Sequence, residues 1–227
     1  MITKKPHIVL VDGYEYELGK LKNNTIHYDF EKLVRFLDAK GKSEFGQNFK
    51  IFEEDFEIIY KLCCYIIEDK QTCEKMNIDI QKGILLSGPI GSGKTSIMKL
   101  LRFIVPHKRQ YKIIPCRNTV FSFNLLGFKT IEDYGNEGYY CFDDLGLEPS
   151  GRHFGKDCNV MGEILLSRYD MYSKTLSLRV QSRSLTHATT NLNAKELEER
   201  YGNRVRSRMR ELFNLIAFHE NSMDKRK

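Results

Sequence analysis

A glycine-rich loop between an apolar run and an amphipathic stretch constrains this chain more than any other feature. Residues 83–87 form a short apolar run, as expected of a buried strand. Residues 88–95 then read Gly-Pro-Ile-Gly-Ser-Gly-Lys-Thr, and apolar residues recur at helical spacing from Ile97 until Pro106. A strand joined to a helix by so short a loop predicts an α/β fold built on a sheet.

The composition of this loop predicts its chemistry. Its glycines let the backbone turn tightly and point N–H groups inward, at a helix N-terminus whose dipole also favours an anion. Lys94 is expected to reach the β and γ phosphates of a nucleotide, and the Thr95 hydroxyl to ligate Mg²⁺. The sequence therefore predicts a P-loop NTPase that binds ATP, or alternatively GTP, with Mg²⁺. The predicted loop residues are Gly88, Pro89, Ile90, Gly91, Ser92, Gly93, Lys94, Thr95 and Ser96.

A second apolar run ends in two acids. Residues 139–142 read Tyr-Tyr-Cys-Phe, and Asp143 and Asp144 come directly after them. This pattern is typical of a Walker B strand, in which an acid at the strand end completes the Mg²⁺ shell. We expect Asp143 in that shell and Asp144 polarising the attacking water. The alternative for Asp144 is a side chain that only hydrogen-bonds its neighbours.

A third apolar run, 185–190, ends at a polar amide. Asn191 follows this run, and an amide at that strand end is suited to orient the same water and to sense the γ phosphate. The alternative is an ordinary turn or cap residue, because Asn is common where strands end. His187 lies inside the run and is interpreted as a core histidine, since phosphoryl transfer needs no imidazole. Asn193 with Glu196 predicts a capping box that opens the next helix.

That next helix is unusually rich in arginine. Phosphoryl transfer gains from a guanidinium on the γ phosphate, and neither the loop nor the Walker B segment contains an arginine. This helix is therefore the expected donor, in cis or from a neighbouring subunit of an oligomer. The alternative is a solvated face paired with nearby glutamates. The expected buried stripe is Leu197, Tyr201, Val205 and Met209, and the arginines are Arg200, Arg204, Arg206, Arg208 and Arg210.

The remaining pattern predicts one core with an appendage. Strands at 83–87, 111–114, 139–142 and 185–190 alternate with helical stretches at 120–128 and 160–172, which favours a parallel sheet with helices on both faces. We expect residues 49–227 to form this core, with a leading helix from residue 56. Residues 1–48 are expected to form a small N-terminal appendage with a hairpin over 8–18 and a helix from Phe30.

Composition excludes several protein classes. The 227 residues are 41% hydrophobic and 29% charged, and no apolar run approaches the roughly 20 residues of a membrane span. No export signal is visible, so we expect a cytoplasmic protein. The six cysteines lack paired spacing and are expected to be reduced and buried rather than to bind zinc. The net charge of +6 is compatible with nucleic acid but does not establish it.

The order of these parts resembles the AAA+ ATPases of the DnaC/IstB type, which include bacterial and phage helicase loaders and transposition helper ATPases. The segments that carry the resemblance are 88–95, 142–146, 189–192 and 201–210, within a region of about 80–220. It implies Asn191 as sensor 1 and Arg208 as the arginine finger, with Arg204 as the next candidate. It also implies an ASCE sheet, nucleotide-dependent homo-oligomers on single-stranded DNA, and a replicative helicase or transposase as client.

The sequence departs from this family in two ways. Asp144 stands where many members carry glutamate, and the chain ends soon after an apolar run at 215–218, which implies no C-terminal helical lid. A shorter carboxylate and a lidless core suit a slow switch rather than a processive motor. We therefore expect weak ATPase activity that DNA or a partner stimulates.

Two other function classes stay open. One is a small-molecule phosphotransferase of the nucleotide-kinase kind, and the other is a nucleotide-binding adaptor that hydrolyses nothing. DNA contact is expected of the basic positions, unless these only form a solvated face. The positions are 107–109, Arg179, Arg183 and 225–227, with 151–156 as a mobile loop.

Overall fold

The computed structural model describes residues 5–136, 138–178 and 185–226. These residues form two compact units. The first comprises residues up to 80 together with 96–110, and the second comprises residues 81–95 and those from 111 onward. The expected domain boundary near residue 48 stays a prediction. Arg179 and Arg183 lie outside the described residues.

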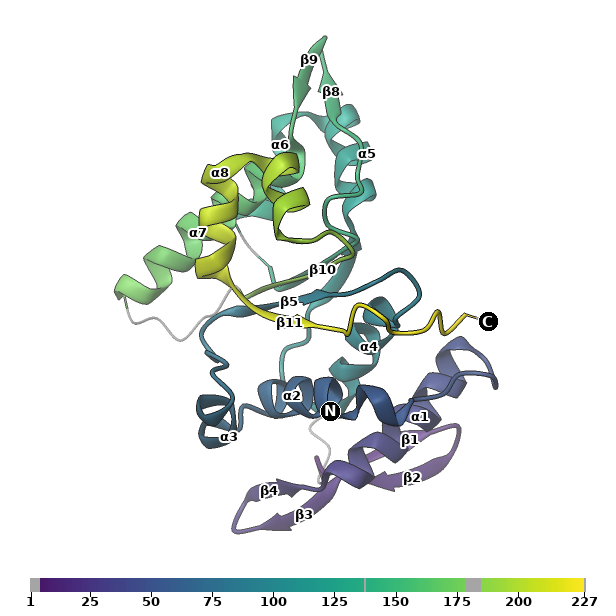
Figure 1. Ribbon diagram of the computed structural model, residues 1–227. Helices are drawn as coiled ribbons and strands as arrows, with labels where there is room; N and C mark the ends of the chain where they lie inside the picture. The colour runs from purple at the N-terminus through teal and green to yellow at the C-terminus, as the bar shows by residue number, and fades with distance from the viewer. Residues whose placement is uncertain (1–4, 137, 179–184, 227) are drawn as a thin grey trace. The chain divides into compact units, whose positions relative to one another are not determined.

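The second unit is built on a five-stranded parallel sheet (Figure 1). Its strand order is β11-β5-β10-β7-β6, so β10 lies between the strand that precedes the glycine-rich loop and the strand that ends in the two acids. The strands are β5 (Gly83–Ser87), β6 (Lys112–Pro115), β7 (Tyr140–Asp143), β10 (Thr186–Thr190) and β11 (Phe213–Ala217). The alternation of strands and helices along the chain thus gives the predicted parallel sheet.

Helices of this unit cover the sheet. One buried cluster joins β5, β7, β10 and β11 to three helices, with Leu85, Phe142, Ala188 and Phe213 as its strand members. The strand residues that point the other way, Ile84 and Cys141, are buried as well, as in a sheet covered on both faces. The helices are α5 (Cys116–Leu126), α6 (Phe128–Gly135), α7 (Val160–Leu178) and α8 (Ala194–Leu212), and α4 (Lys94–Leu101) begins in this unit.

Two local predictions differ from the structure. The segment expected as a mobile loop is a β-hairpin of β8 (Gly151–His153) and β9 (Lys156–Cys158). Its two central residues, Phe154 and Gly155, both have positive φ (47° and 77°), as a tight hairpin turn requires. Gly127, at φ 62°, separates α5 from α6, so the helical stretch predicted over 120–128 crosses a break between two helices.

The arginine-rich helix α8 has the predicted buried stripe and one unpredicted break. Leu197, Tyr201, Val205 and Met209 are all buried, and the Asn193–Glu196 capping box is present. Gly202 is non-helical at φ 80° and divides α8 into two helical segments. A glycine can adopt this conformation without the Cβ clash that other residues suffer.

His187 is a satisfied core histidine, as predicted. Its side chain is fully buried, its Nδ1 accepts a hydrogen bond from the Ile84 N–H (3.0 Å), and its Nε2 meets the Tyr139 hydroxyl (2.8 Å). Burial lowers the pKa of His187 to about 3, with the Arg168 charge as a second cause. The ring therefore stays neutral at physiological pH. Its hydrogen bonds within the core indicate a structural role rather than a catalytic one.

The first unit contains two hairpins, helices α1 to α3 and most of α4 within the described residues. The predicted hairpin is β1 (Ile8–Val11) with β2 (Tyr14–Glu17), and a second, unpredicted hairpin is β3 (Gly19–Lys22) with β4 (Thr25–Tyr28). Helices α1 (Phe30–Phe45), α2 (Phe56–Ile67) and the short α3 (Lys70–Lys75) follow, with 3₁₀ turns at Glu53–Asp55 and Arg102–Ile104. The two longer helices agree with the predicted ones.

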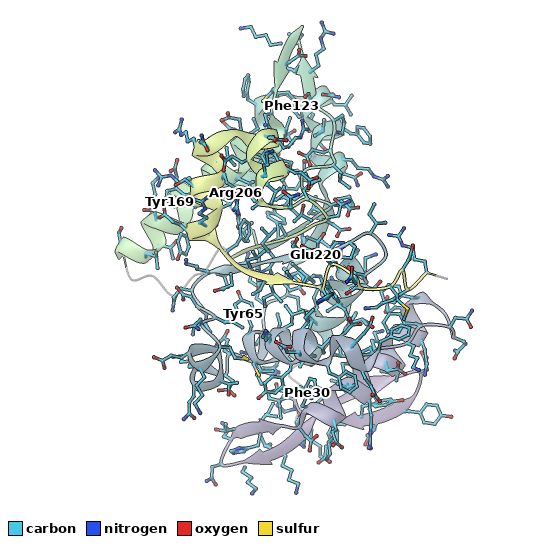
Figure 2. All side chains as sticks on the ribbon, in the orientation of Figure 1. Phe30, Tyr65, Phe123, Tyr169, Arg206 and Glu220 are labelled. Carbon is cyan, nitrogen blue, oxygen red and sulfur yellow. The ribbon has the colours of Figure 1, made fainter. Side chains whose placement is uncertain are left out.

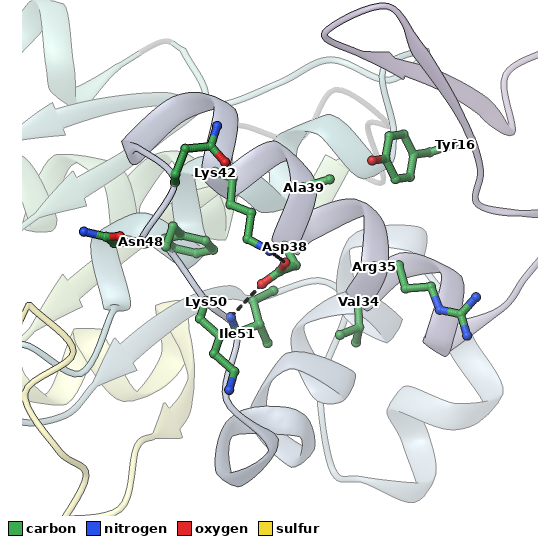
Figure 3. A pocket seen from close by; sticks show the side chains of 11 residues that line it. Tyr16, Val34, Arg35, Asp38, Ala39, Lys42, Asn48, Lys50 and Ile51 are labelled. Atoms are coloured by element: carbon green, nitrogen blue, oxygen red, sulfur yellow. Dashed lines mark hydrogen bonds and ion pairs between the residues drawn. The ribbon is translucent and has the colours of Figure 1, made fainter.

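A pocket of about 770 Å³ lies within this first unit (Figure 3). At its wall Asp38 pairs with Lys42 (2.6 Å) and accepts a hydrogen bond from the Ile51 N–H (3.0 Å). These polar groups satisfy one another at the pocket wall. All six cysteines of the chain are free, and five of them are buried. None of the helices in the described ranges is long and apolar enough to cross a bilayer.

Candidate functional site

Three segments that are distant in sequence meet at one edge of the parallel sheet. The loops that follow β5, β10 and β7 all leave from the carboxyl ends of their strands, where α/β sheets bind ligands. Backbone hydrogen bonds tie them together: the Gly88 N–H donates to the Thr190 carbonyl (3.2 Å), and the Leu145 N–H donates to the Thr189 carbonyl (2.8 Å). Strand β10 thereby links the glycine-rich loop to the segment with the two acids.

The glycine-rich loop needs glycine for its shape. Gly91 and Gly93 have φ of 83° and 93°, a region that other residues rarely adopt. Residues with successive N–H groups in such conformations form the concave anion-binding nest that phosphates occupy. The Ser92 hydroxyl oxygen is buried and has no hydrogen-bond partner among the described residues. This shape and the unused donor group fit the phosphates of a nucleotide.

Lys94 is held within the loop. Its side chain is only 6% exposed, and its Nζ donates to the Gly88 carbonyl (2.7 Å) and the Pro89 carbonyl (2.8 Å). Burial lowers the pKa of Lys94, while Asp144 and Asp143 oppose that shift. A cation held out of water beside the nest is placed where a phosphate would compensate its lost hydration.

Thr95 and Asp143 lie side by side. The Thr95 hydroxyl donates to Asp143 Oδ1 (2.8 Å), and the Thr189 hydroxyl donates to the same oxygen (2.6 Å). Hydroxyl and carboxylate oxygens are ligands that Mg²⁺ accepts, together with phosphate oxygens and water. No cluster of three or more His, Cys, Asp or Glu side chains able to hold a metal occurs within the described ranges. The pair therefore fits an ion that the nucleotide phosphates help to bind.

The Asp144 carboxylate takes no part in such pairing. Its N–H donates to the Thr189 hydroxyl (3.0 Å), its φ is 58°, and its carboxylate makes no hydrogen bond with another described residue. Desolvation raises the pKa of Asp144, and the neighbouring Asp143 raises it further. A carboxylate left free beside the phosphate loop, with a raised proton affinity, suits a group that orients and polarises water.

Asn191 lies at the end of β10, between the other two loops. Its Oδ1 is buried and has no hydrogen-bond partner among the described residues. A buried amide oxygen without a partner is costly unless a ligand or water satisfies it. The role of Asn191 in sensing the nucleotide stays a prediction, as do the roles of the other site residues.

The two predicted arginine-finger candidates differ in their surroundings. Arg208 is occupied within the chain: its Nη1 donates to the Tyr169 hydroxyl and to Glu211 Oε1 (both 3.1 Å), and its guanidinium lies 4.3 Å from the Tyr169 ring centroid. Figure 2 labels Tyr169 on α7 and Arg206 on α8. Arg204 is exposed and makes no hydrogen bond or ion pair with the rest of the described chain. Arg204 is thus the freer of the two.

Sequence reasoning missed a buried glutamate that connects the Walker B segment to α8. Glu148 is 4% exposed and accepts hydrogen bonds from the Gly146 N–H (2.8 Å) and the Tyr201 hydroxyl (2.6 Å). Arg200 forms an ion pair with it at 3.6 Å. Burial, with Glu148 as the second cause, raises the pKa of Tyr201. An isolated glutamate two residues after a glycine carries no sequence signal for this role.

Three further residues near the acids were also missed. Thr189 bridges both acids, and the charges of Arg117 and Arg226 both act to lower the pKa of Asp144. Arg226 belongs to the basic tail expected to contact DNA, yet residues 218–226 run along the glycine-rich loop, as the yellow segment of Figure 1 shows. A pair of adjacent threonines at a strand end was the available signal for Thr189.

The β8–β9 hairpin is a second notable surface of this unit. Phe154 at its tip is 93% exposed, and its ring lies 4.3 Å from the ring of His153. The hairpin is docked on α5, because the Arg152 N–H donates to Asn124 Oδ1 (2.7 Å) and His153 contacts Phe123, which Figure 2 labels. The Phe154 ring is therefore exposed to solvent at the tip of a hairpin that packs on α5.

No protein-family model and no curated protein match this sequence. Several solved structures do, among them the following three. The DnaC helicase loader is 18% identical with a TM-score of 0.51, over 74% of this chain and 92% of that chain. A putative primosome component from Streptococcus pyogenes serotype M3 is 18% identical with a TM-score of 0.51, over 76% and 83%. AMPPCP-bound DnaA from Aquifex aeolicus is 16% identical with a TM-score of 0.44, over 78% and 50%.

At such low identity the first two structures bear on the fold alone. They match this fold over 74% and 76% of this chain, each with a TM-score of 0.51. The chain therefore has the P-loop α/β fold of the AAA+ type, and its structure is similar to that of the DnaC helicase loader, as the sequence predicted.

Proposed function

We propose that this chain is an ATP-binding and slowly hydrolysing AAA+ switch protein that acts in DNA replication or transposition in the manner of a helicase loader. One observation carries the proposal. The carboxyl ends of β5, β7 and β10 bring Lys94, Thr95, Asp143, Asp144 and Asn191 to one edge of the sheet. That set supplies a phosphate clamp, an Mg²⁺ site and two groups able to orient water.

The site residues would divide the chemistry among them. The loop N–H groups and Lys94 bind the phosphates, and Thr95 with Asp143 holds Mg²⁺, which neutralises phosphate charge when bound. Asp144 and Asn191 orient the attacking water, whose proton Asp144 accepts. Arg204 or Arg208 supplies the finger, and we favour Arg204 because it has no partner in the rest of the described chain. A finger acting in trans would make the active form an oligomer.

Hydrolysis is the first test of this proposal. Turnover should be slow for the chain alone and should rise with single-stranded DNA or the client. Asp144→Asn should lower the rate about 100-fold, because it removes the water-polarising carboxylate, and should change ATP affinity less than about threefold. Phosphate release measured with and without single-stranded DNA, beside sedimentation velocity with ATP and Mg²⁺, provides both readouts.

Each competing class gives a different result. A phosphotransferase would consume ATP only when a small acceptor is added, and an adaptor would bind ATP without releasing phosphate. Brisk turnover without DNA or partner would contradict a switch. The neighbouring structures favour the switch, because one of them is a helicase loader and another a putative primosome component.

We further propose that the β8–β9 hairpin contacts single-stranded DNA. Phe154 is 93% exposed at the tip of a docked hairpin. Arg152, on β8, has a side chain that is 72% exposed and lies 3.8 Å from the Asp157 carboxylate on β9. Bases stack on exposed aromatic rings, and nearby cations bind the phosphates. Phe154→Ala should therefore weaken single-stranded DNA binding about tenfold, measured by fluorescence anisotropy at low salt.

Phe121→Ala is the matched control for this experiment, because Phe121 is also exposed (55%) but lies on α5 rather than at the hairpin tip. Its effect should stay below about twofold. If Phe154→Ala and Phe121→Ala bind DNA with equal affinity, the hairpin tip does not contact DNA. A complete lack of DNA affinity at low salt would remove the DNA part of the proposed function.

The N-terminal residues 1–48 are proposed to recognise the client protein. Their support is the exposure of apolar and aromatic side chains on the first hairpin, where Leu10 is 67% and Tyr14 73% exposed. Exposed side chains of this kind are common at protein interfaces. Loss of client binding on deletion of this segment, with ATP binding kept, is the expected result.

A further inference from the structure

The pocket of the first unit is lined by side chains of β2, of α1 and of residues 47–51, which follow this helix (Figure 3). After α1 ends, the Phe49 N–H donates to the Gly46 carbonyl (3.0 Å), and the Ile51 N–H donates to Asp38 Oδ1 on α1 (3.0 Å). The Phe49 ring lies so close to Gly41 that a Cβ there would overlap it. Residues 47–51 are therefore held against α1, and the pocket is part of the folded unit.

Apolar side chains contribute to the lining of this pocket. Ile51 is buried, and Val34 and Ala39 on α1 are half-buried. Its volume of about 770 Å³ lies in the range of about 300–1,000 Å³ that is usual for ligand sites. Apolar groups of a ligand would leave water on entering such a pocket, which favours binding.

The two aromatic residues of the pocket already pack within the chain. The centroid of the Tyr16 ring lies 6.1 Å from that of Phe36, and the centroid of the Phe49 ring lies 5.3 Å from that of Phe45. Tyr16 and Phe49 are half-buried, whereas Phe154 on the β8–β9 hairpin is 93% exposed. Single-stranded nucleic acids stack their bases on open ring faces. The pocket therefore favours another kind of ligand.

The charged residues of the pocket leave an excess of positive charge. Asp38 is its acidic residue, and Lys42 neutralises that carboxylate at 2.6 Å. Lys50 is exposed and forms no ion pair within the described ranges. Arg35 is 77% exposed, and its ion pair with Glu31 spans 3.9 Å. Exposed pairs of this kind contribute little, so the Arg35 and Lys50 cations can both bind carboxylates of a ligand.

Two side-chain amides complete the pocket. Gln47 and Asn48 are exposed, and their side chains make no hydrogen bond with another described residue. An amide both donates and accepts, so it can pair with the N–H and C=O groups of a peptide backbone. We propose that this pocket binds an acidic peptide segment of the client protein, with apolar side chains against α1 and carboxylates at Arg35 and Lys50. This inference rests on the proposed role of the N-terminal residues in client recognition.

The test is a peptide-binding titration of the full chain, followed by fluorescence anisotropy. The probes are a fluorescein-labelled peptide of glutamate and leucine and a matched peptide of lysine and leucine. The wild type should bind the glutamate peptide at least about tenfold more tightly, and high salt should reduce this difference. Arg35→Glu and Lys50→Glu should each weaken binding of the glutamate peptide about tenfold, because each replaces an attraction by a repulsion.

Two further variants separate the pocket from a general effect of charge. Lys22→Glu makes the same change of charge at an exposed position of β3 outside the pocket and should weaken binding less than about twofold. Val34→Ser keeps the charge but removes apolar contact inside the pocket and should weaken binding about threefold. Equal effects of Lys22→Glu and Lys50→Glu would overturn the inference.

Three other results would also overturn it. One is a glutamate peptide that does not bind, and another is equal binding of the two peptides by the wild type. The third is a single-stranded oligonucleotide that binds more tightly than the glutamate peptide and that Arg35→Glu and Lys50→Glu both release. That third result would identify the pocket as a nucleic-acid contact.

Failure of this inference can be distinguished from failure of the proposed function. If deletion of residues 1–48 abolishes client binding but the glutamate peptide does not bind the full chain, only the inference fails. If client binding survives that deletion, the role of the N-terminal residues in client recognition fails, and the inference fails with it. A chain that binds the peptide in the pocket but hydrolyses no ATP would overturn the ATPase alone.

Discussion

Replacing Lys94 with alanine is expected to weaken ATP binding about 100-fold and to reduce hydrolysis below detection. Lys94 Nζ is the cation already buried at the phosphate loop, where it now donates to two loop carbonyls. Charge-assisted hydrogen bonds to phosphate are worth about 1.5–3 kcal/mol each, and the lysine is expected to reach two phosphates. Isothermal titration calorimetry with ATP and Mg²⁺ measures this loss directly.

The matched control is Lys99→Ala. Lys99 lies on the same helix, α4, but its side chain is exposed, so ATP binding should change less than about twofold. Urea denaturation of Lys94→Ala is measured alongside, so that a loss of ATP binding is not mistaken for a loss of folding. ATP affinity in Lys94→Ala within about threefold of the wild type would mean that the nucleotide does not occupy this loop.

Replacing Arg168 with methionine is expected to destabilise the second unit by about 3–5 kcal/mol. Arg168, on α7, is fully buried. Its Nε donates to the Thr186 hydroxyl (2.8 Å), and its Nη2 donates to the carbonyls of Gly138 (3.0 Å) and Leu185 (3.1 Å). Methionine fills part of the volume but leaves these acceptors without a donor, and each buried unsatisfied group costs about 1–3 kcal/mol.

Urea denaturation followed by circular dichroism is the appropriate measurement for this variant. Lys174→Met, on the exposed face of the same helix, is the control and should change the free energy of unfolding by less than about 0.5 kcal/mol. Arg168→Lys should be intermediate, because its single ammonium keeps the charge but not the planar fork. A loss below about 1 kcal/mol in Arg168→Met would show that water satisfies the three acceptors.

Buried polar contacts connect the candidate nucleotide site to other parts of the second unit. Glu148 joins the loop after the two acids to α8 through Tyr201 and Arg200. Any movement of that loop on hydrolysis would therefore reach the arginine-rich helix. Such a connection is what a nucleotide-dependent switch needs, because its two states must differ away from the phosphates.

The sequence alone determined the features that depend on local pattern. The glycine-rich loop between a strand and a helix, the acids after an apolar run, and the capping box with its buried stripe each follow from residues that are close together in the chain. Helical and strand periodicity depend on burial of one face, so they can be read from a single segment. The parallel sheet followed from the alternation of these segments.

The local pattern did not predict the β8–β9 hairpin or the break in α8. The hairpin at 151–158 was interpreted as a loop because its strands have three residues each, and the break at Gly202 was missed because the apolar stripe continues across it. Short strands and single glycines leave too little periodic signal to detect.

Only the tertiary structure decided which distant residues meet. Strand β10 inserts between β5 and β7, which brings Thr189 to both acids and leaves the Asn191 amide oxygen between the loops. The buried partners of Glu148 and Arg168, and the docking of residues 218–226 on the glycine-rich loop, depend in the same way on strand order and on long-range hydrogen bonds. Such pairings carry no periodicity in the sequence, because each joins segments whose separation along the chain is set by the topology of the sheet.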